Sequence, residues 1–251
     1  MEMNDAGWSL EIKTQSWVED TENQVDFIIK TLQLTGHERI LDLACGFGRH
    51  SLSLARRGFS VLGVDFTKAF IDDAIQSAQR DSLNNVEFLH ADIRKLKFNS
   101  EFDVVLNLAD GAIGYFDSEE ENLHTFDVIS GALKKGGKHF MDVCNAEHAE
   151  LFFPKRHWEI GMHKVSLPEF DWDAKRRRML FTDWSIEFGK VAAKPEKIEK
   201  DTEGMRLYSR SELSDILRQR NMHIVQTFSN YYGREETNRE LQLLVYSIKD
   251  S

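Results

Sequence analysis

The stretch RILDLACGFGRHSLSLARRGF, residues 39–59, decides the fold. Its apolar start predicts a buried strand, Gly46 and Gly48 predict a tight turn, and apolar residues at helical spacing predict a helix over 48–57. A strand, a glycine turn and a helix in this order are typical of a nucleotide-type binding site. The loop is close to a dinucleotide fingerprint, but no third glycine follows Gly48, and no Gly-Lys-Ser/Thr of an ATP-type loop is present.

Strand-like and helix-like runs alternate outward from this stretch through residue 143. Alternation at this length predicts βαβ units and a parallel sheet that is buried on both faces. An amphipathic helix is also expected before the sheet, at Trp17–Leu34. The expected strands are Arg39–Leu43, Ser60–Val64, Val86–His90, Phe102–Asn107 and Lys138–Val143, and the expected helices after the first strand are 48–57, 67–78 and 118–133.

The pattern changes after the fifth strand. Three tryptophans and an apolar-polar alternation in RRMLFTDWSIEF predict antiparallel strands inserted into the sheet, before a helix and two last strands return to it. The sequence therefore predicts an α/β, Rossmann-like, doubly wound fold, with a seven-stranded mostly parallel sheet and an inserted antiparallel β lid. The expected units are residues 1–147 (helix and binding core), 148–205 (lid, acceptor or dimer subdomain) and 206–251 (last helix and strands).

Composition limits the classes of partner. The 251 residues are 41% hydrophobic and 29% charged, and the formal net charge is −10, so the average field opposes nucleic acid. The basic run at residues 175–178 is interpreted as a solvated hairpin turn rather than a nucleic-acid patch.

The chain also carries no sign of a membrane or of an oxidising compartment. Its acidic first five residues do not resemble a signal peptide, and no apolar run is long enough to span a membrane. The two cysteines, Cys45 and Cys144, are expected to be free and reduced. A cytoplasmic protein is therefore expected, without nucleic-acid or membrane partners and with a homodimer as an option.

Acidic residues close three successive strands: Asp42, Asp65 and Asp92. An acid at the end of the second strand, about 20 residues past the glycine loop, accepts hydrogen bonds from ribose hydroxyls. Asp92 can accept a bond from the adenine amine. Together with the missing third glycine, these acids favour a ligand with a ribose and an adenine but without a pyrophosphate.

The chain resembles the class I S-adenosylmethionine-dependent methyltransferases, within them the bacterial small-molecule and uncharacterised subgroup. The matching pieces are ILDLACGFGRH, VLGVDF, VEFLHADI, FDVVLNL and LKKGGK, which together cover roughly residues 36–145. The family often has glycine where Ala44 stands. The resemblance implies S-adenosylmethionine as cofactor, S-adenosylhomocysteine as product, and these cofactor-binding residues: Ala44, Cys45, Gly46, Gly48, Asp65, Phe66, Asp92, Ile93, Asn107 and Leu108.

Catalytic residues are weakly encoded, because methyl transfer by in-line displacement depends mainly on positioning and desolvation. Asp110 and Tyr115 follow the fourth strand and are candidates to contact the acceptor, and His148 is a candidate base after the fifth strand. No cluster has metal-ligand spacing, so no metal is predicted. Residues 107–110, Asn-Leu-Ala-Asp, lie at the end of the fourth strand and lack the prolines that are usual at this place in nucleobase methyltransferases.

The predicted function is methyl transfer to a nitrogen or oxygen atom of a small-molecule acceptor. A peptide or protein N-methyltransferase, a non-catalytic S-adenosylmethionine-binding module and a nicotinamide dehydrogenase are the alternatives. Binding of S-adenosylhomocysteine separates the dehydrogenase from the others.

Overall fold

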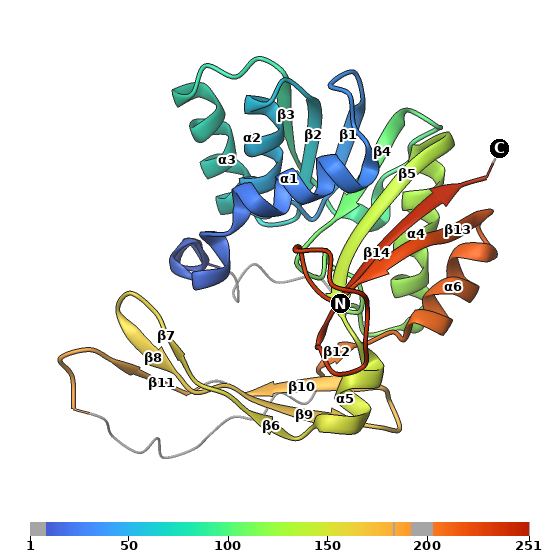
Figure 1. Ribbon diagram of the computed structural model, residues 1–251. Coiled ribbons are helices and arrows are strands. Elements are labelled where there is room, and N and C mark those ends of the chain that lie inside the picture. Colours follow the sequence, from blue (N-terminus) through green and yellow to red (C-terminus); the bar gives the residue numbers. More distant parts are fainter. Residues whose placement is uncertain (1–8, 183, 192–202, 251) are drawn as a thin grey trace.

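The computed structural model describes residues 9–182, 184–191 and 203–250 (Figure 1). The acidic start of the chain and residues 192–202 of the expected insertion lie outside the described residues. Among the described helices, none is long and apolar enough to cross a membrane.

A seven-stranded sheet forms the core, with the order β13-β14-β5-β4-β1-β2-β3. The five strands β1 to β5 pair in parallel, whereas β14 is antiparallel to both β5 and β13. The predicted mostly parallel sheet is confirmed. The strands are β1 Arg39–Leu43, β2 Ser60–Asp65, β3 Val86–His90, β4 Phe102–Asn107, β5 Leu133–Cys144, β13 Met222–Phe228 and β14 Gln242–Lys249.

Helices cover both faces of this sheet because alternate side chains of the central strands are apolar on each side. Ile40 of β1 packs in one cluster with residues of α1 and α2, while its neighbour Leu41 packs in another with residues of α4 and α6. The helices are α1 Thr21–Leu32, α2 Arg49–Arg56, α3 Lys68–Arg80, α4 Glu119–Ala132, α5 Ala146–Phe152 and α6 Arg210–Arg218, with 3-10 turns η2 Leu10–Thr14, η3 Ser16–Val18 and η4 Ile93–Lys95.

The first helix starts later than expected. The predicted helix Trp17–Leu34 is divided into the turn η3 and the helix α1, because the Thr21 hydroxyl donates to the Val18 carbonyl, 2.6 Å away, before α1 begins. Gln33, at φ +50°, then ends the helix in a left-handed conformation. This division lets the segment 10–18 leave the helix axis and reach the carboxyl end of the sheet (Figure 1).

The strand order reverses at β1, which has β2 on one side and β4 on the other. The loops after these strands diverge there, and doubly wound sheets bind ligands outside the carboxyl ends of strands at this kind of switch point. Residues that follow β1, β2 and β4 are therefore brought to one place.

The segment after α5 forms two antiparallel sheets, in the orders β12-β10-β9-β6 and β11-β8-β7. This confirms the predicted antiparallel strands, and Figure 1 shows them beyond the carboxyl end of the core sheet. Met179, Met205 and Leu207 pack there against Ala146 and Ala149 of α5. The strands are β6 Lys155–Arg156, β7 Glu159–Ile160, β8 Lys164–Ser166, β9 Glu169–Asp173, β10 Arg178–Thr182, β11 Ser185–Glu187 and β12 Met205–Arg206.

The basic run 175–178 lies at the turn between β9 and β10, as expected, but only its first part is solvated. Lys175 and Arg176 are exposed, whereas Arg178 is 5% exposed. The expectation of a solvated turn is therefore wrong for Arg178, because its guanidinium is turned inward to backbone carbonyls.

Candidate functional site

A cavity of about 330 Å³ lies at the switch point. Its size is in the range of small-molecule sites. Residues from the loops after β1, β2, β3 and β4 line it, together with side chains of η2 and η3. Nine of the thirteen predicted site residues are among the lining residues: Ala44, Cys45, Gly46, Asp65, Phe66, Asp92, Ile93, Leu108 and Tyr115.

The glycine loop is held by Asp65. One carboxylate oxygen of Asp65 accepts from the Gly46 amide at 2.8 Å, and the other accepts from the Thr67 amide at 2.7 Å. Each carboxylate oxygen has further lone pairs, so Asp65 can still accept bonds from a ligand in the cavity. Asp65 thus joins the loop after β1 to the end of β2.

Gly48 lies outside the lining residues and has a packing role. It adopts φ +75°, and a Cβ there would come within 2.7 Å of the Phe88 ring. Only glycine combines this left-handed conformation with so close an approach of the helix start to β3. Gly48 therefore sets the position of α2 rather than a surface of the cavity.

Asp92 closes the cavity on the β3 side and caps the turn η4. Its carboxylate accepts from the backbone and side chain of Arg94, with an ion pair at 2.8 Å. These hydrogen bonds hold the pKa of Asp92 below its usual value, so the side chain is a carboxylate at neutral pH. It lies beside Ile93, whose side chain is buried.

Arg49 is a lining residue that the sequence analysis missed. It begins α2, where a cation opposes the helix dipole. Its guanidinium donates to Thr21 and Gln24 of α1 at 2.8 and 2.7 Å and lies 4.9 Å from the Trp17 ring centroid. Burial lowers the pKa of Arg49, although it stays charged at neutral pH. The signal in the sequence was this cation directly after the second glycine.

His50, also a lining residue, is neutral. Burial lowers its pKa well below the usual value, and its ring nitrogen Nε2 lies 2.8 Å from the Gln24 amide oxygen. Asp42 lines the cavity nearby and accepts from the Ser51 hydroxyl at 2.6 Å. Among the described lining residues, Arg49 is therefore the permanent cation, beside Asp42, Asp65 and Asp92.

The turn after β4 is left-handed. Residues 109–112 have φ values of 51°, 67°, 51° and 63°, and three of the four are not glycine. Each such residue costs about 1–2 kcal/mol relative to a right-handed conformation. Contacts with β5 offset that cost: the Asp110 amide donates to the Asp142 carbonyl at 2.7 Å, and the Cys144 amide donates to the Asp110 carboxylate at 3.1 Å. The left-handed turn presents Ala109, Gly111 and Ala112 to the cavity.

Asn107 and Asp110 lie behind this turn and are not lining residues. The Asn107 side-chain amide donates to the carbonyls of Leu43 and Gly111, and the side chain is fully buried. The Asp110 side chain lies at the Cys144 backbone, so it anchors the turn to β5. Both residues shape the wall that Leu108 and Ala109 present.

Asp110 should make stability depend on pH. Burial, and next the Asp142 carboxylate, raise the pKa of Asp110 to about 7 from 3.8. Between about pH 4 and about pH 7 the folded protein holds a proton that the unfolded chain has released, so the free energy of unfolding falls as pH rises. Asp110→Asn should remove the contribution of this carboxyl to the pH dependence of the free energy of unfolding. The drop in Tm between pH 5 and pH 8 should then be smaller by about 5 °C.

Asparagine suits this test because it keeps an oxygen for the Cys144 amide and tolerates a positive φ. Thermal unfolding followed by circular dichroism at the two pH values gives the readout. Asp72→Asn, at an exposed carboxylate of α3, is the matched control and should keep the wild-type drop. A wild-type drop in Asp110→Asn would contradict the prediction.

The other two predicted catalytic residues lie far apart. Tyr115 lines the cavity and is 43% exposed. His148 lies in α5, is 3% exposed and is not a lining residue; its Nδ1 is 3.2 Å from the Asn238 carbonyl oxygen, and its ring lies 4.7 Å from that of Phe152. Of the three candidates, the structure brings only Tyr115 to the cavity.

The segment 10–18 covers one side of the cavity through Ile12 and Trp17. Lys13 holds this segment down, because its ammonium pairs with Asp73 of α3 at 2.7 Å and lies 5.4 Å from the Phe47 ring centroid. The sequence analysis missed both lining residues, since nothing local to residues 10–18 indicates which part of the sheet they contact. No group of three or more potential metal ligands occurs in residues 9–182, 184–191 and 203–250.

Comparisons with known proteins agree with this geometry. A family model described as a methyltransferase domain matches residues 34–202. The chain is 31% identical over 177 residues to glycine/sarcosine N-methyltransferase of Aphanothece halophytica, covering 68% of this chain and 66% of that protein. It is 33% identical over 117 residues to the putative methyltransferase YqeM of Bacillus subtilis, covering 46% of each. The match thus spans between about half and two thirds of these relatives.

Two solved structures share the fold along most of their length. The CcbJ methyltransferase from Streptomyces caelestis has a TM-score of 0.77 at 16% identity, covering 98% of this chain and 94% of that one. The sugar N-methyltransferase KedS8 from Streptoalloteichus sp. has a TM-score of 0.67 at 15% identity, with the same coverage. At these identities the likeness shows a common fold.

Proposed function

The chain belongs to the class I S-adenosylmethionine-dependent methyltransferases, and from this premise we propose that it methylates a nitrogen or oxygen atom of a small-molecule acceptor. The observation that carries the proposal is the cavity at the switch point, where Asp65, Asp92 and Arg49 converge. Two acids at the ends of β2 and β3 suit the ribose and the adenine, and a half-buried cation suits an amino-acid carboxylate.

We assign the lining residues to the parts of the cofactor as follows. Asp65 accepts from the ribose hydroxyls, with Phe66 against the adenine. Asp92 accepts from the adenine amine, beside Ile93. Arg49 binds the methionine carboxylate, and backbone atoms of the glycine loop and of Leu108 meet the methionine and its amino group. The other proposed contacts are those of Ala44, Cys45 and Gly46, while Gly48 and Asn107 support the loop and the wall from behind.

The bound cofactor supplies a methyl group activated by a sulfonium. This chain's residues then have to orient the acceptor in line and exclude water, because the reaction disperses charge and gains little from a strong base. Tyr115 is placed to orient the acceptor from the cavity wall. Asp110, whose carboxylate anchors the turn, acts through the position of that wall.

An amine is the favoured acceptor within the small-molecule class. A free amine can attack before it loses its proton, so the cavity needs no positioned general base. The glycine/sarcosine N-methyltransferase and the sugar N-methyltransferase KedS8 have names that indicate amine acceptors. His148, the candidate base, is not among the residues that line the cavity, which favours the amine over a hydroxyl that must be deprotonated early.

We assign the insertion 148–205 to the acceptor side, as a lid and platform beyond the carboxyl end of the sheet. The alternative use of its antiparallel strands is a homodimer interface. Peptide or protein N-methylation and cofactor binding without catalysis are the rival functions. A cytoplasmic location stays part of the proposal, and the net charge of −10 supports the absence of nucleic-acid partners.

The test has two steps. Calorimetry with S-adenosylhomocysteine and with NADH should give binding of the first only. Labelled S-adenosylmethionine is then incubated with a set of small amines (glycine, sarcosine, amino sugars), hydroxylated metabolites and peptides, and labelled products are identified by mass spectrometry. Labelled small amines support the proposal, labelled peptides alone favour the rival enzyme, and binding without any product favours the non-catalytic module.

A further inference from the structure

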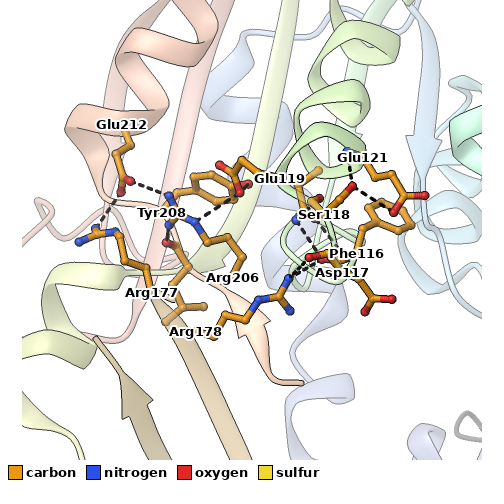
Figure 2. A network of polar contacts seen from close by, with 12 residues as sticks. Phe116, Asp117, Ser118, Glu119, Glu121, Arg177, Arg178, Arg206, Tyr208 and Glu212 are labelled. Atoms are coloured by element: carbon orange, nitrogen blue, oxygen red, sulfur yellow. Dashed lines mark hydrogen bonds and ion pairs between the residues drawn. The ribbon is translucent and has the colours of Figure 1, made fainter. Parts of the chain in front are cut away.

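Arg178 is the most deeply buried charged residue of the inserted sheets' basic turn, and it faces the core. Figure 2 shows its guanidinium directed at the carbonyl groups of Phe116 and Asp117, which lie 2.6 and 3.0 Å from Nη2. Its Nη1 donates to the carbonyls of Glu203 and Gly204 at 3.2 and 2.7 Å. One side chain therefore joins three segments: β10, the two residues that precede β12, and the chain that precedes α4.

The wall segment, defined as residues 113–118, runs between the left-handed turn and α4. Two of its residues, Tyr115 and Phe116, line the cavity. Phe116 is held on its other side by Asn122, whose amide group bonds to both the Phe116 amide and its carbonyl. The Phe116 carbonyl is thus shared between α4 and Arg178, and any movement of the inserted sheet at Arg178 reaches a lining residue directly.

A second contact joins β12 to the same wall segment. The Arg206 amide donates to the Gly114 carbonyl at 2.8 Å. Gly114 has φ +86°, and a Cβ there would overlap the carbonyl oxygen of Arg206, so glycine permits this approach. The Arg206 side chain pairs with Glu119 and Glu212 and lies over the Tyr208 ring, as Figure 2 shows. The two strands β10 and β12 therefore hold both ends of the wall segment.

We propose that Arg178 is a positioning residue for the acceptor side of the cavity, where it fixes the wall segment against the inserted sheet. This inference rests on the proposed methyltransferase function. Asp65, Arg49 and the glycine loop, which we assign to the cofactor, make no contact with Arg178 among the described interactions. Arg178 therefore governs acceptor binding more than cofactor binding.

The chemistry of the side chain explains why arginine stands there. A planar guanidinium presents donors in a rigid fork, so one group can meet two carbonyls on each side at once. A lysine ammonium has three donors at one point and keeps the charge, but it cannot span both carbonyl pairs with this geometry. Arg178→Lys therefore removes some of the hydrogen bonds at this junction but keeps a positive charge at the same position.

The experiment compares Arg178→Lys with Arg156→Lys, the same substitution at an exposed arginine of β6 in the same sheet, whose side chain pairs with Glu169. In Arg178→Lys we expect hydrogen exchange to accelerate at the amides of 113–118. The KM for the amine acceptor found in the screen should rise about tenfold, since small misplacements at a reacting centre are costly. Affinity for S-adenosylhomocysteine should change by less than about threefold. Arg156→Lys should match the wild type in all three measurements.

Several results would overturn the inference. They are an unchanged acceptor KM with unchanged exchange in Arg178→Lys, or an equal loss of affinity for cofactor and acceptor, which would indicate general destabilisation. If circular dichroism shows that Arg178→Lys is unfolded, Gly114→Ala takes its place, because an added Cβ there separates β12 from the wall segment. The same result is then expected: a higher KM for the acceptor with little change in affinity for S-adenosylhomocysteine. Failure of the proposed function is distinct, because the wild type would then label no small-molecule acceptor, while the exchange measurement in the free protein still tests the junction.

Discussion

Replacing Arg49 by methionine is expected to weaken S-adenosylhomocysteine binding about 100-fold, because it removes a half-buried, charge-assisted partner of the amino-acid carboxylate. Methionine keeps much of the apolar length of the side chain against Trp17. Isothermal titration calorimetry at one salt concentration measures the change. Methylthioadenosine, which has the adenosine part but no carboxylate, should bind the variant and the wild type alike.

Arg56→Met is the matched control for this prediction. Arg56 lies on the same helix, is exposed, and pairs with Asp81 at 2.5 Å away from the cavity. It should leave both affinities unchanged. If Arg49→Met weakens the binding of methylthioadenosine as much as that of S-adenosylhomocysteine, the lost affinity comes from a displaced α1 or segment 10–18. Arg49 is then not the partner of the carboxylate.

The second large effect is expected at Asp65. Asp65→Ala should weaken S-adenosylhomocysteine binding by about 1–3 kcal/mol through the lost ribose bonds. The upper end of this range is favoured because Asp65 also holds the Gly46 and Thr67 amides, so its removal loosens the glycine loop itself. Methylthioadenosine should lose affinity to the same extent, in contrast to its behaviour with Arg49→Met.

Two further variants separate the roles of Asp65. Asp65→Asn keeps one oxygen as acceptor and should lose less than Asp65→Ala. Asp72→Ala, an exposed aspartate of α3, should bind as the wild type does. Calorimetry that finds no loss in Asp65→Ala would remove Asp65 from the site.

The parallel strands and the cavity residues that lie at their ends could be predicted from the sequence, and the reason is local. Strands such as β1 and β2 are short apolar runs, and the residue that ends each run lies at the carboxyl edge of a parallel sheet. The sequence alone therefore predicts that the three acids at the strand ends lie close together. All three line the cavity: Asp42, Asp65 and Asp92. The glycine spacing adds a turn whose conformation few other residues adopt.

The other half of the site depends on contacts between distant segments. Trp17 reaches the cavity only because α1 starts late and η3 turns toward the sheet. Asp110 was a reasonable candidate from its position after β4, but a left-handed turn directs its carboxylate to the Cys144 amide. No spacing rule predicts four consecutive left-handed residues, because local propensity opposes them and contacts with β5 and with the Asn107 side chain stabilise them.

The sequence by itself determined the sheet, its antiparallel insertion and the placement of acidic residues at the ends of three strands, because apolar periodicity and strand ends are properties of neighbouring residues. Only the tertiary structure decided that Arg49 is the cation of the cavity and that Arg178 is buried. Arg178 meets the Phe116 carbonyl across 62 positions of the chain. Such contacts arise from packing, where the cost of burying a charge is met by carbonyl groups that folding brings together.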